Sequence, residues 1–463
     1  MRPVFGALAM PPGNVAAADV ARGPQTCSVR TANREAIWSL LRKAVFAILL
    51  IRASSDPIFN LLGGDSGTGS MGIGALFNVA VIAIAGLLLL QAPLKAPFPV
   101  IAIWGPYLLI AFGSTLYAPD FNAAARLAFV LLSYWAFFAI PFFIMRSSRD
   151  LTRFVLVVIG SSLPPTLYAF VDIARGLSSF GDFRLQSTFS HPNIYAFYLV
   201  LLLGLALYVR ASQAVDVSQR IRLLVTLYIP LLAIFLLLTK TRSAWGVCGM
   251  MFLVYAVRIE RRFLFGLLLV PLMFVSNPSL MDRLTDVTAA TEVDDYSQLN
   301  DSNRLNSYVW RRALWESALP QIMDMPALGH GLETFKPATP RFFPLIGPQG
   351  IDGHNFYLQT TYELGLFGLL TVAWLFGCLA WRLARGWRRD PPGILIISCI
   401  LMTYVLECYS DNMHFYLSFN WYFWFVMGTI CAWLAQGDAI AAATTSRLPG
   451  SAGRAGRPAR PRS

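Results

Sequence analysis

The sequence contains few charged residues. Only 13% of its 463 residues are Asp, Glu, Lys or Arg, whereas 56% are hydrophobic. A soluble globular protein carries about 25% charged residues, so the deficit predicts an all-α polytopic membrane protein with about twelve transmembrane helices. The net charge of +12 does not indicate a nucleic-acid partner, because most Lys and Arg residues form short clusters between apolar runs, where they set topology.

The sequence also lacks the motifs of several enzyme classes. Its six cysteines include no Cys-x-x-Cys pair, so neither a metal site nor a disulfide framework is indicated. It has no glycine-rich phosphate loop followed by Lys-Ser/Thr and no His-Glu-x-x-His motif, which argues against an ATPase and a zinc protease. Only Asp294–Asp295 resembles a carboxylate pair, which gives little support to a metal-dependent transferase with a nucleotide-sugar donor. We therefore expect no metal and no cofactor.

Apolar segments long enough to cross a membrane recur along the chain. A spanning helix needs about 20 mostly apolar residues. Twelve candidates are found at residues 38–54, 75–92, 98–118, 124–145, 151–173, 192–210, 222–240, 244–258, 262–277, 359–381, 393–409 and 415–435. The first candidate contains Arg42 and Lys43, which makes it the weakest of the twelve.

These segments divide the chain into five regions. Residues 1–36 are rich in Ala, Gly and Pro and are predicted to be a disordered cytoplasmic tail. Residues 37–277 hold predicted helices 1–9, residues 278–358 form a large outer loop, and residues 359–436 hold helices 10–12. The basic tail, residues 437–463, is predicted to lie inside.

The basic residues between the segments test this topology. With the N-terminus inside, the inner connections carry thirteen Lys or Arg residues and the short outer connections carry four. The inner residues are Lys95, Arg146, Arg149, Arg210, Arg220, Arg222, Arg258, Arg261, Arg262, Arg382, Arg385, Arg388 and Arg389. The outer residues are Arg175, Arg184, Lys240 and Arg242. The excess inside satisfies the positive-inside rule, and one missed or extra helix would invert part of it.

The large outer loop leads into the longest polar interruption of the C-terminal half. This interruption, residues 304–368, holds two of the four histidines, His330 and His354. Apolar residues at helical spacing predict an amphipathic helix at the membrane surface. They are Val309, Leu314, Trp315, Ala318, Leu319 and Ile322. Other residues that the topology places on the outer face are Arg184, His191, Arg242, Asp411, Asn412 and His414.

His354 is the first candidate for chemistry. The topology places it where the outer loop returns to the membrane, and an imidazole with a pKa near 6.5 suits a general base at neutral pH. Asn355 follows it directly, and Gly365 and Gly368 come later in the same apolar segment, where they would allow close packing against a neighbour. The structural alternative is an interfacial histidine bonded to a backbone carbonyl, which composition alone slightly favours.

Arginines on the outer face are candidates for binding an anion. Arg242 stands at the outer end of an apolar helix, where the positive-inside rule disfavours it, and a guanidinium can grip a phosphate with two hydrogen bonds. The alternative is an arginine that reaches to lipid headgroups. Arg311 and Arg312 leave the same choice open, and one of the two is expected to face solvent or headgroups. Arg184 is equally ambiguous.

The other histidines are expected to be structural. His191 precedes Pro192 in His-Pro-Asn, a pattern typical of a helix start with proline in the first turn. His330 lies between two glycines and is expected in a turn. His414 lies in an aromatic-rich segment whose Trp and Tyr residues are typical of a membrane interface.

Two motifs resemble a known family. The segment RRALWESALPQIMDMPALGHGLETF follows the pattern of an arginine, three residues, a tryptophan, and a Pro-x-x-Gly-x-Gly turn ending in phenylalanine. Its residues are Arg311, Trp315, Pro326, Gly329, Gly331 and Phe335. The pattern His-Asn, nine residues, Gly-x-x-Gly is matched by His354, Asn355, Gly365 and Gly368. Together with TKTRSAW, these motifs resemble the O-antigen ligase and O-antigen polymerase superfamily of bacterial inner membranes.

The resemblance implies a metal-independent, inverting glycosyltransferase. The donor would be a glycan on undecaprenyl diphosphate, presented on the periplasmic face of a multi-pass inner-membrane protein with both termini cytoplasmic. Arg242 and Arg311, together with Arg184, would hold the diphosphate, and His354 would take the proton from an acceptor sugar hydroxyl. Trp315, Asn355, Gly365 and Gly368 would be structural residues of the motifs. The implied partners are the lipid-linked donor, an acceptor glycan, membrane lipids, a chain-length regulator and a flippase.

Three alternatives remain open at this stage. A polymerase extends the glycan on its lipid carrier, whereas a ligase transfers the finished polymer to lipid A core, and the motifs do not separate them. We favour a polymerase of exopolysaccharide or O-antigen, only from the general character of the last outer segment, SDNMHFYLSFNWYFWF. The rival from another class is a transporter of a glycan or another solute. Many transporters are built from two similar halves, and the chain has no halves that match, which argues against this class. The third is a non-catalytic assembly subunit.

Overall fold

The computed structural model describes residues 24–58, 73–91, 98–176, 183–266, 307–343 and 346–447, together with residues 275 and 281. The chain divides into two compact units, Met1–Ala47 and Ile48–Ser463. Among the described residues, the regular elements are helices and there is no strand. The all-α prediction is therefore confirmed.

The helices follow the predicted apolar segments closely. Their bounds are α1 Pro24–Arg52, α3 Ile73–Gln91, α4 Phe98–Ser114, α5 Phe121–Ile144, α6 Ser148–Gly160, α7 Leu163–Arg175, α8 Pro192–Ala211, α9 Gln219–Leu238, α10 Arg242–Arg258, α13 Ser307–Asp324, α14 Phe335–Phe342, α15 Phe356–Gly386, η3 Trp387–Arg389, α16 Pro391–Ser410, η4 Met413–Phe415 and α17 Leu417–Arg447. Most of the candidate segment 262–277, the tail 1–23 and most of the acidic part of the outer loop lie outside the described residues.

Six stretches of the described chain are helical, long and apolar enough to cross a membrane, and two shorter apolar helices accompany them. The polytopic membrane class is thus confirmed, whereas the count of twelve stays a prediction. One of the six, Ser148–Arg175, is broken into α6 and α7. The break follows from Pro164 and Pro165, which donate no backbone hydrogen bond and disfavour a continuous helix.

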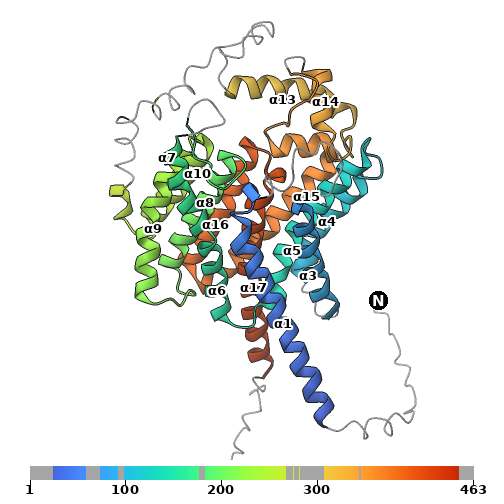
Figure 1. The fold of residues 1–463 in the computed structure, drawn as a ribbon. Coiled ribbons are helices and arrows are strands. Elements are labelled where there is room, and N and C mark those ends of the chain that lie inside the picture. The colour runs from blue at the N-terminus through green and yellow to red at the C-terminus, as the bar shows by residue number, and fades with distance from the viewer. Residues whose placement is uncertain are drawn as a thin grey trace, which may run out of the picture. The chain divides into compact units, whose positions relative to one another are not determined.

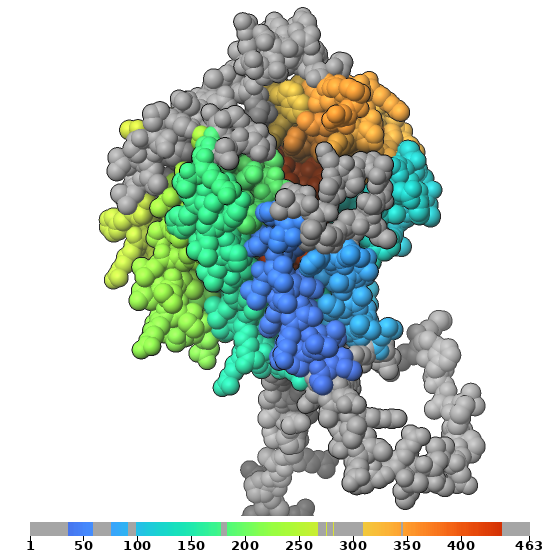
Figure 2. Space-filling model, in the orientation of Figure 1, coloured from blue at the N-terminus to red at the C-terminus, as the bar shows by residue number. Residues whose placement is uncertain are grey.

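The helices of the second unit differ greatly in burial. In α8, 89% of the apolar window is buried inside the protein, and the helix packs against α9, α10, α16, α17 and α6. In α9 only 28% is buried, and Figure 2 shows this yellow-green helix on the outer surface. A helix that is apolar all round is buried in a protein core or in lipid. Hence α8 belongs to the core, and α9 offers its apolar residues to hydrocarbon.

The helices α13 and α14 lie over the end of the bundle where α15 begins (Figure 1). A cluster of buried residues joins them to α15, and its members are Ala313, Leu314, Ala318, Phe335, Phe343 and Tyr362. The predicted apolar face of this surface helix is partly wrong, because Leu319 is exposed and Ala313 is buried. Leu314, Ala318, Trp315 and Ile322 of the predicted face do pack in this cluster, and the helix rests on α14 and α15.

Candidate active site

His354 lies in the turn immediately before α15. Asn355 caps that helix, because its side-chain oxygen accepts hydrogen bonds from the backbone N–H groups of Tyr357 and Leu358 at 3.0 and 3.1 Å. The backbone of His354 has a φ of +46°, a left-handed conformation that costs an L-residue other than glycine energy. The surrounding contacts therefore hold the imidazole in one position at the start of the helix.

Gly353 is fixed from two sides. The indole of Trp315 donates a hydrogen bond to the Gly353 carbonyl at 2.7 Å, and the Gly353 N–H donates to the Gln359 side chain at 2.9 Å. Gln359 in turn donates to the buried carboxyl of Glu363 at 2.9 Å and accepts a hydrogen bond from Asn412. The predicted motif residue Trp315 thus supports the backbone directly before His354.

The helix α15 is interrupted at Gly365, which has φ +65° and ψ −167°. The loop of residues 326–331 fills the interruption. Its backbone accepts hydrogen bonds from the N–H groups of Leu366 and Phe367, and it donates to the carbonyls of Tyr362 and Glu363. The close neighbour predicted for Gly365 is therefore a loop, and the loop satisfies backbone groups that the broken helix leaves unpaired.

The loop and the helix approach so closely that no side chain fits between them. A Cβ on Gly365 would overlap the carbonyl of Ala327, and a Cβ on Gly329 would overlap the backbone of Glu363. Gly368 has a different neighbour, since its Cβ would meet the side chain of Leu364 within the same helix. Gly329 of the Pro-x-x-Gly-x-Gly motif and Gly365 of the Gly-x-x-Gly motif therefore lie on two sides of one packing contact.

Asp411 is the residue that faces His354. Its Oδ1 lies 3.7 Å from Nδ1 of His354, beyond hydrogen-bond length but within reach of an ion pair when the imidazole is protonated. The Asp411 side chain is 4% exposed and that of His354 is 32% exposed. The imidazole thus has a buried carboxylate on one side and an open surface on the other.

The electrostatics of Asp411 favour its ionised form. Burial alone would raise the pKa of this carboxyl, but its interactions with His354, the hydroxyl of Tyr416 and the charge of Arg311 outweigh burial and lower the pKa to about 2. Asn193 also donates a hydrogen bond to Asp411 Oδ2 at 2.7 Å. Asp411 is therefore a carboxylate at neutral pH, suited to stabilising a positive charge on His354.

Arg184 reaches the same cluster through Asn193. One guanidinium nitrogen donates to the side-chain oxygen of Asn193 at 2.9 Å and to the hydroxyl of Thr241 at 3.2 Å. Its Nε donates to the carbonyl of Thr239 at 3.0 Å. These bonds tie the connection before α8 to the turn between α9 and α10. Arg242 is the first residue of α10 and directly follows Thr241.

Arg311 and Arg312 have different surroundings. The sequence analysis expected one of the two to face solvent or headgroups, and Arg312 is the exposed one. Arg311 Nη1 donates to the carbonyl of Ser410 at 2.8 Å, and its charge acts on the neighbouring Asp411. Arg312 pairs with Glu316 at 2.8 Å, and its side chain is 67% exposed. The structure thus brings His354, Arg311 and Arg184 into one cluster, and Arg242 directly follows Thr241, which bonds to Arg184.

The remaining histidines have packing roles. His191 caps α8 by accepting the N–H of Asn193, with Pro192 as the first helical residue, so the predicted helix start is confirmed. His330 lies in the turn and stacks on Tyr362 with ring centroids 4.5 Å apart. His414 is buried and bonds to the hydroxyl of Tyr107. In the described part of the chain, no three His, Cys, Asp or Glu side chains are grouped closely enough to hold a metal ion.

The comparison with protein families agrees with the two motifs. Residues 227–373 match the family model described as O-antigen ligase. Over these residues the chain matches the O-antigen ligase family. The resemblance to the superfamily of O-antigen ligases and polymerases is therefore confirmed, and the chain is a membrane enzyme of that type. A comparison with curated proteins gave no match.

The O-antigen ligase match contains most of the site, though not all. His354, Arg242 and Arg311 lie within residues 227–373, whereas Arg184 and Asp411 lie outside them on either side. Sequence reasoning assigned no role to Asp411. The signal that could have found it is its position on the predicted outer face, where a carboxylate next to a re-entering histidine would suit proton transfer. The side chains outside the matched region complete the cluster around His354.

Proposed function

We propose that the protein transfers a glycan from undecaprenyl diphosphate to an acceptor sugar hydroxyl on the periplasmic face of the bacterial inner membrane. The observation that carries this proposal is the arrangement of His354, whose imidazole is partly exposed and has the buried carboxylate of Asp411 behind it. Such an arrangement suits a general base that becomes positively charged during the reaction. The family match supports the class of reaction.

In this reaction His354 takes the proton of the acceptor hydroxyl. The hydroxyl oxygen forms a bond to the anomeric carbon of the donor sugar, the bond from that carbon to the diphosphate oxygen breaks, and undecaprenyl diphosphate leaves with the electron pair. Attack opposite the leaving group inverts the configuration of the anomeric carbon. Asp411 stabilises the imidazolium that forms, and the proton later passes from His354 to solvent.

The arginines would bind the diphosphate. Arg311 lies next to Asp411 and donates a hydrogen bond from its side chain to the carbonyl of Ser410, while Arg184 is oriented by Asn193 and Thr241. A leaving diphosphate is already anionic, so guanidinium groups can stabilise it without a general acid. This reaction requires no metal. Arg242, beside Thr241, is the third member of the proposed set.

Within this class we favour a polymerase that lengthens the glycan on its lipid carrier. The test uses the purified full-length protein in liposomes with a lipid-linked repeat unit and no other acceptor. A ladder of lengthened lipid-linked products is expected, and it should be absent with His354→Ala. Arg311→Ala should weaken donor use far more than Arg312→Ala, because these neighbours differ mainly in whether they face the site.

The other outcomes are equally decisive. No ladder alone, but transfer after lipid A core is added, would identify a ligase. Full activity of His354→Ala would remove the proposed base and, with it, the main support for a catalytic role. Movement of the unmodified glycan across sealed vesicles, without any new glycosidic bond, would identify a transporter.

A further inference from the structure

A polar cavity lies at the opposite end of α8 from the candidate active site. Its volume is about 430 Å³, within the usual range of ligand-binding pockets. The residues that line it come from the ends of α8, α9 and α10, and they include Arg210, Gln219, Arg222, Tyr255 and Glu260. With a rise of 1.5 Å per helical residue, it lies roughly 25 Å along α8 from Asn193. The proposed transfer reaction does not use it.

Arg210 and Glu260 form a closed ion pair in this cavity. Two guanidinium nitrogens of Arg210 donate to the two carboxylate oxygens of Glu260 at 2.7 and 2.8 Å, and a third donates to Thr226 at 3.1 Å. Tyr255 donates a further bond to Glu260 at 3.3 Å. The negative charge of Glu260 is thus neutralised within the wall of the cavity, and the pair leaves no net charge.

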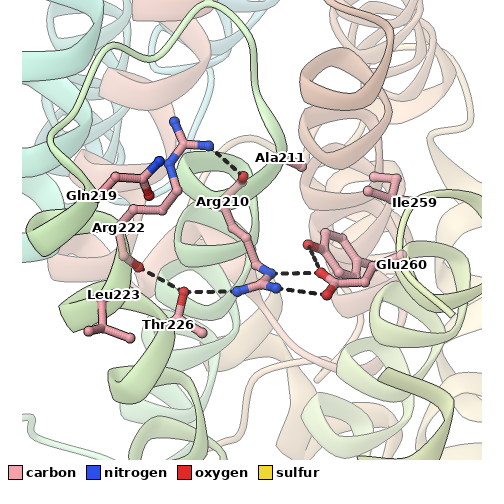
Figure 3. Close-up of a pocket in the computed structure, with 9 residues that line it drawn as sticks. Arg210, Ala211, Gln219, Arg222, Leu223, Thr226, Ile259 and Glu260 are labelled. Atoms are coloured by element: carbon pink, nitrogen blue, oxygen red, sulfur yellow. Dashed lines mark hydrogen bonds and ion pairs between the residues drawn. The ribbon is translucent and has the colours of Figure 1, made fainter. Parts of the chain in front are cut away.

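Arg222 supplies the positive charge that remains. Its Nη1 donates to the carbonyl of Arg210 at 3.0 Å, but its Nε is buried and has no hydrogen-bond partner. The protein therefore compensates the charge of this guanidinium only in part, and an anion in the cavity that Arg222 lines would be favoured. Figure 3 shows the amide of Gln219 next to the Arg222 guanidinium, at the side of the cavity away from Glu260.

The start of α9 adds to this preference for an anion. Gln219 is the first residue of α9, and Ser218 caps it by accepting the N–H of Ile221 at 3.4 Å. The N-terminus of a helix carries a partial positive charge and favours negative groups. Arg222, Gln219 and this helix end therefore share one side of the cavity and one electrostatic preference.

The outer face of α9 next to the cavity is apolar and exposed. Leu223, which lines the cavity, is 59% exposed, and Leu227, one turn further along α9, is 63% exposed. Only 28% of the most apolar part of α9 is buried inside the protein, so such leucines face the hydrocarbon of the membrane. A ligand with a charged head in the cavity would therefore have room for apolar chains along α9.

We propose that this cavity binds the phosphate of an anionic diacyl lipid, with Arg222 and Gln219 donating to the phosphate and the acyl chains lying along Leu223 and Leu227. A free phosphate would satisfy the same donors but would leave the exposed leucines without a partner. The site is separate from the His354 cluster and does not depend on the function proposed for that cluster.

The experiment measures binding of short-chain phosphatidylglycerol to the full-length protein in neutral detergent. Phosphatidylcholine and inorganic phosphate are titrated in parallel. Arg222→Gln should weaken phosphatidylglycerol binding about tenfold, because it removes a charge-assisted hydrogen bond. Arg220→Gln is the matched control, since Arg220 is exposed on the same helical turn and does not line the cavity.

A second variant tests the site without removing a structural contact. Gln219→Glu places a negative charge at an exposed position in the first turn of α9, where an acidic residue favours the helix. This variant should fold and lose phosphatidylglycerol binding, whereas Gln213→Glu, exposed but outside the cavity lining, should keep it.

Three results would overturn the proposal. Equal binding by wild type, Arg222→Gln and Gln219→Glu would show that the cavity is not the site. Equal losses in Arg222→Gln and Arg220→Gln would assign binding to the general positive charge of this end. If inorganic phosphate binds as tightly as phosphatidylglycerol, the ligand of the cavity is a soluble phosphate and not a lipid.

Discussion

The two ends of α8 both hold a basic side chain near a carboxylate, but the two pairs differ in kind. At one end, Arg210 and Glu260 are joined by two hydrogen bonds of 2.7 and 2.8 Å. At the other end, His354 and Asp411 stand 3.7 Å apart, with the carboxylate buried and the imidazole partly exposed. In the first pair each charged group is neutralised by its partner, so the pair contributes to the stability of the fold. The second is open on one side, and its base can exchange a proton with a substrate.

The supporting structure differs in the same way. Around Glu260 the bonds come from neighbouring helix ends, Arg210, Thr226 and Tyr255. Around His354 and Asp411 they come from helices far apart in the sequence, through Trp315 of α13 and Asn193 of α8, and His354 itself has a left-handed backbone. Strain that the fold maintains at one exposed residue is typical of a functional site. The difference teaches that the open pair of His354 and Asp411, rather than the cavity beside Arg210, is where chemistry is expected.

The largest effect is expected at His354. His354→Ala should lower the rate of glycan transfer about a thousandfold, because a general base contributes a factor of that order. His354→Asn is needed beside it, since asparagine tolerates the left-handed backbone and separates lost chemistry from altered folding. Rates are measured with the lipid-linked donor in liposomes. His330→Ala, in the same part of the chain, should keep its rate per folded molecule.

Asp411→Asn should lower the rate about a hundredfold, because an amide cannot stabilise the imidazolium as a carboxylate does. The matched control is Asp390→Asn, a buried aspartate at the other end of α16, where it caps the helix. That variant should lose stability and keep its rate per folded molecule. Equal rate losses in the two variants would contradict the assignment of Asp411 to the site.

Asp411 also predicts a pH dependence of stability. Its pKa in the folded protein is lowered to about 2, below the ordinary value of 3.8. A lowered carboxyl pKa means that its stabilising contribution is complete above about pH 4 and is lost as the pH falls towards about 2. The free energy of unfolding of wild type should therefore decrease through this range by about 2 kcal/mol more than that of Asp411→Asn.

Gly365→Ala should destabilise the protein by about 3 kcal/mol, because alanine would occupy a left-handed conformation and overlap the Ala327 carbonyl. The control is Gly377→Ala in the same helix, where no atom lies within 4 Å of the added Cβ. That change should leave stability unaltered or raise it slightly. Chemical unfolding in detergent measures both, and similar values would mean that the loop 326–331 does not hold the break in place.

The smallest effect is expected at the closed pair. Glu260→Gln should lower the free energy of unfolding by about 1 kcal/mol, because the partners are partly exposed and water screens their attraction. Thermal unfolding of the purified protein measures this loss. A loss of several kcal/mol would mean that the pair is desolvated and would weaken the contrast between the two ends of α8.

Much of the fold follows from local patterns in the sequence. Apolar segments near 20 residues long predicted most helices, since a helix in lipid needs that length. The starts of α8 and α15 follow from His-Pro-Asn and His-Asn, where a side chain caps the first turn. The prediction of one helix over residues 151–173 missed the break at Ser161–Ser162, because the length of an apolar run does not record where Pro164 and Pro165 interrupt it.

The site was predicted only in part. The topology placed Arg184, His191, Arg242 and the Asp411 segment on one face, and the structure joins these connections at one end through Asn193, Thr241 and Asp411. The topology could not show which of these residues form the site, because every outer loop contains a polar residue. The role of Asp411 depends on a contact between residues 57 positions apart, and one sequence carries no record of such a pair.

By itself, the sequence determined the membrane class, most helix positions and the resemblance to the O-antigen ligase and polymerase superfamily, because these depend on composition and on short motifs. His354 as the base stays a prediction. The tertiary structure decided which charged side chains are neutralised by a partner and which remain accessible to a substrate. Arg311 and Arg312 are adjacent and chemically identical, yet one lies beside the site and the other is in solvent. The reason is physical: a charge acts through distance and burial, and both are set only when remote segments pack together.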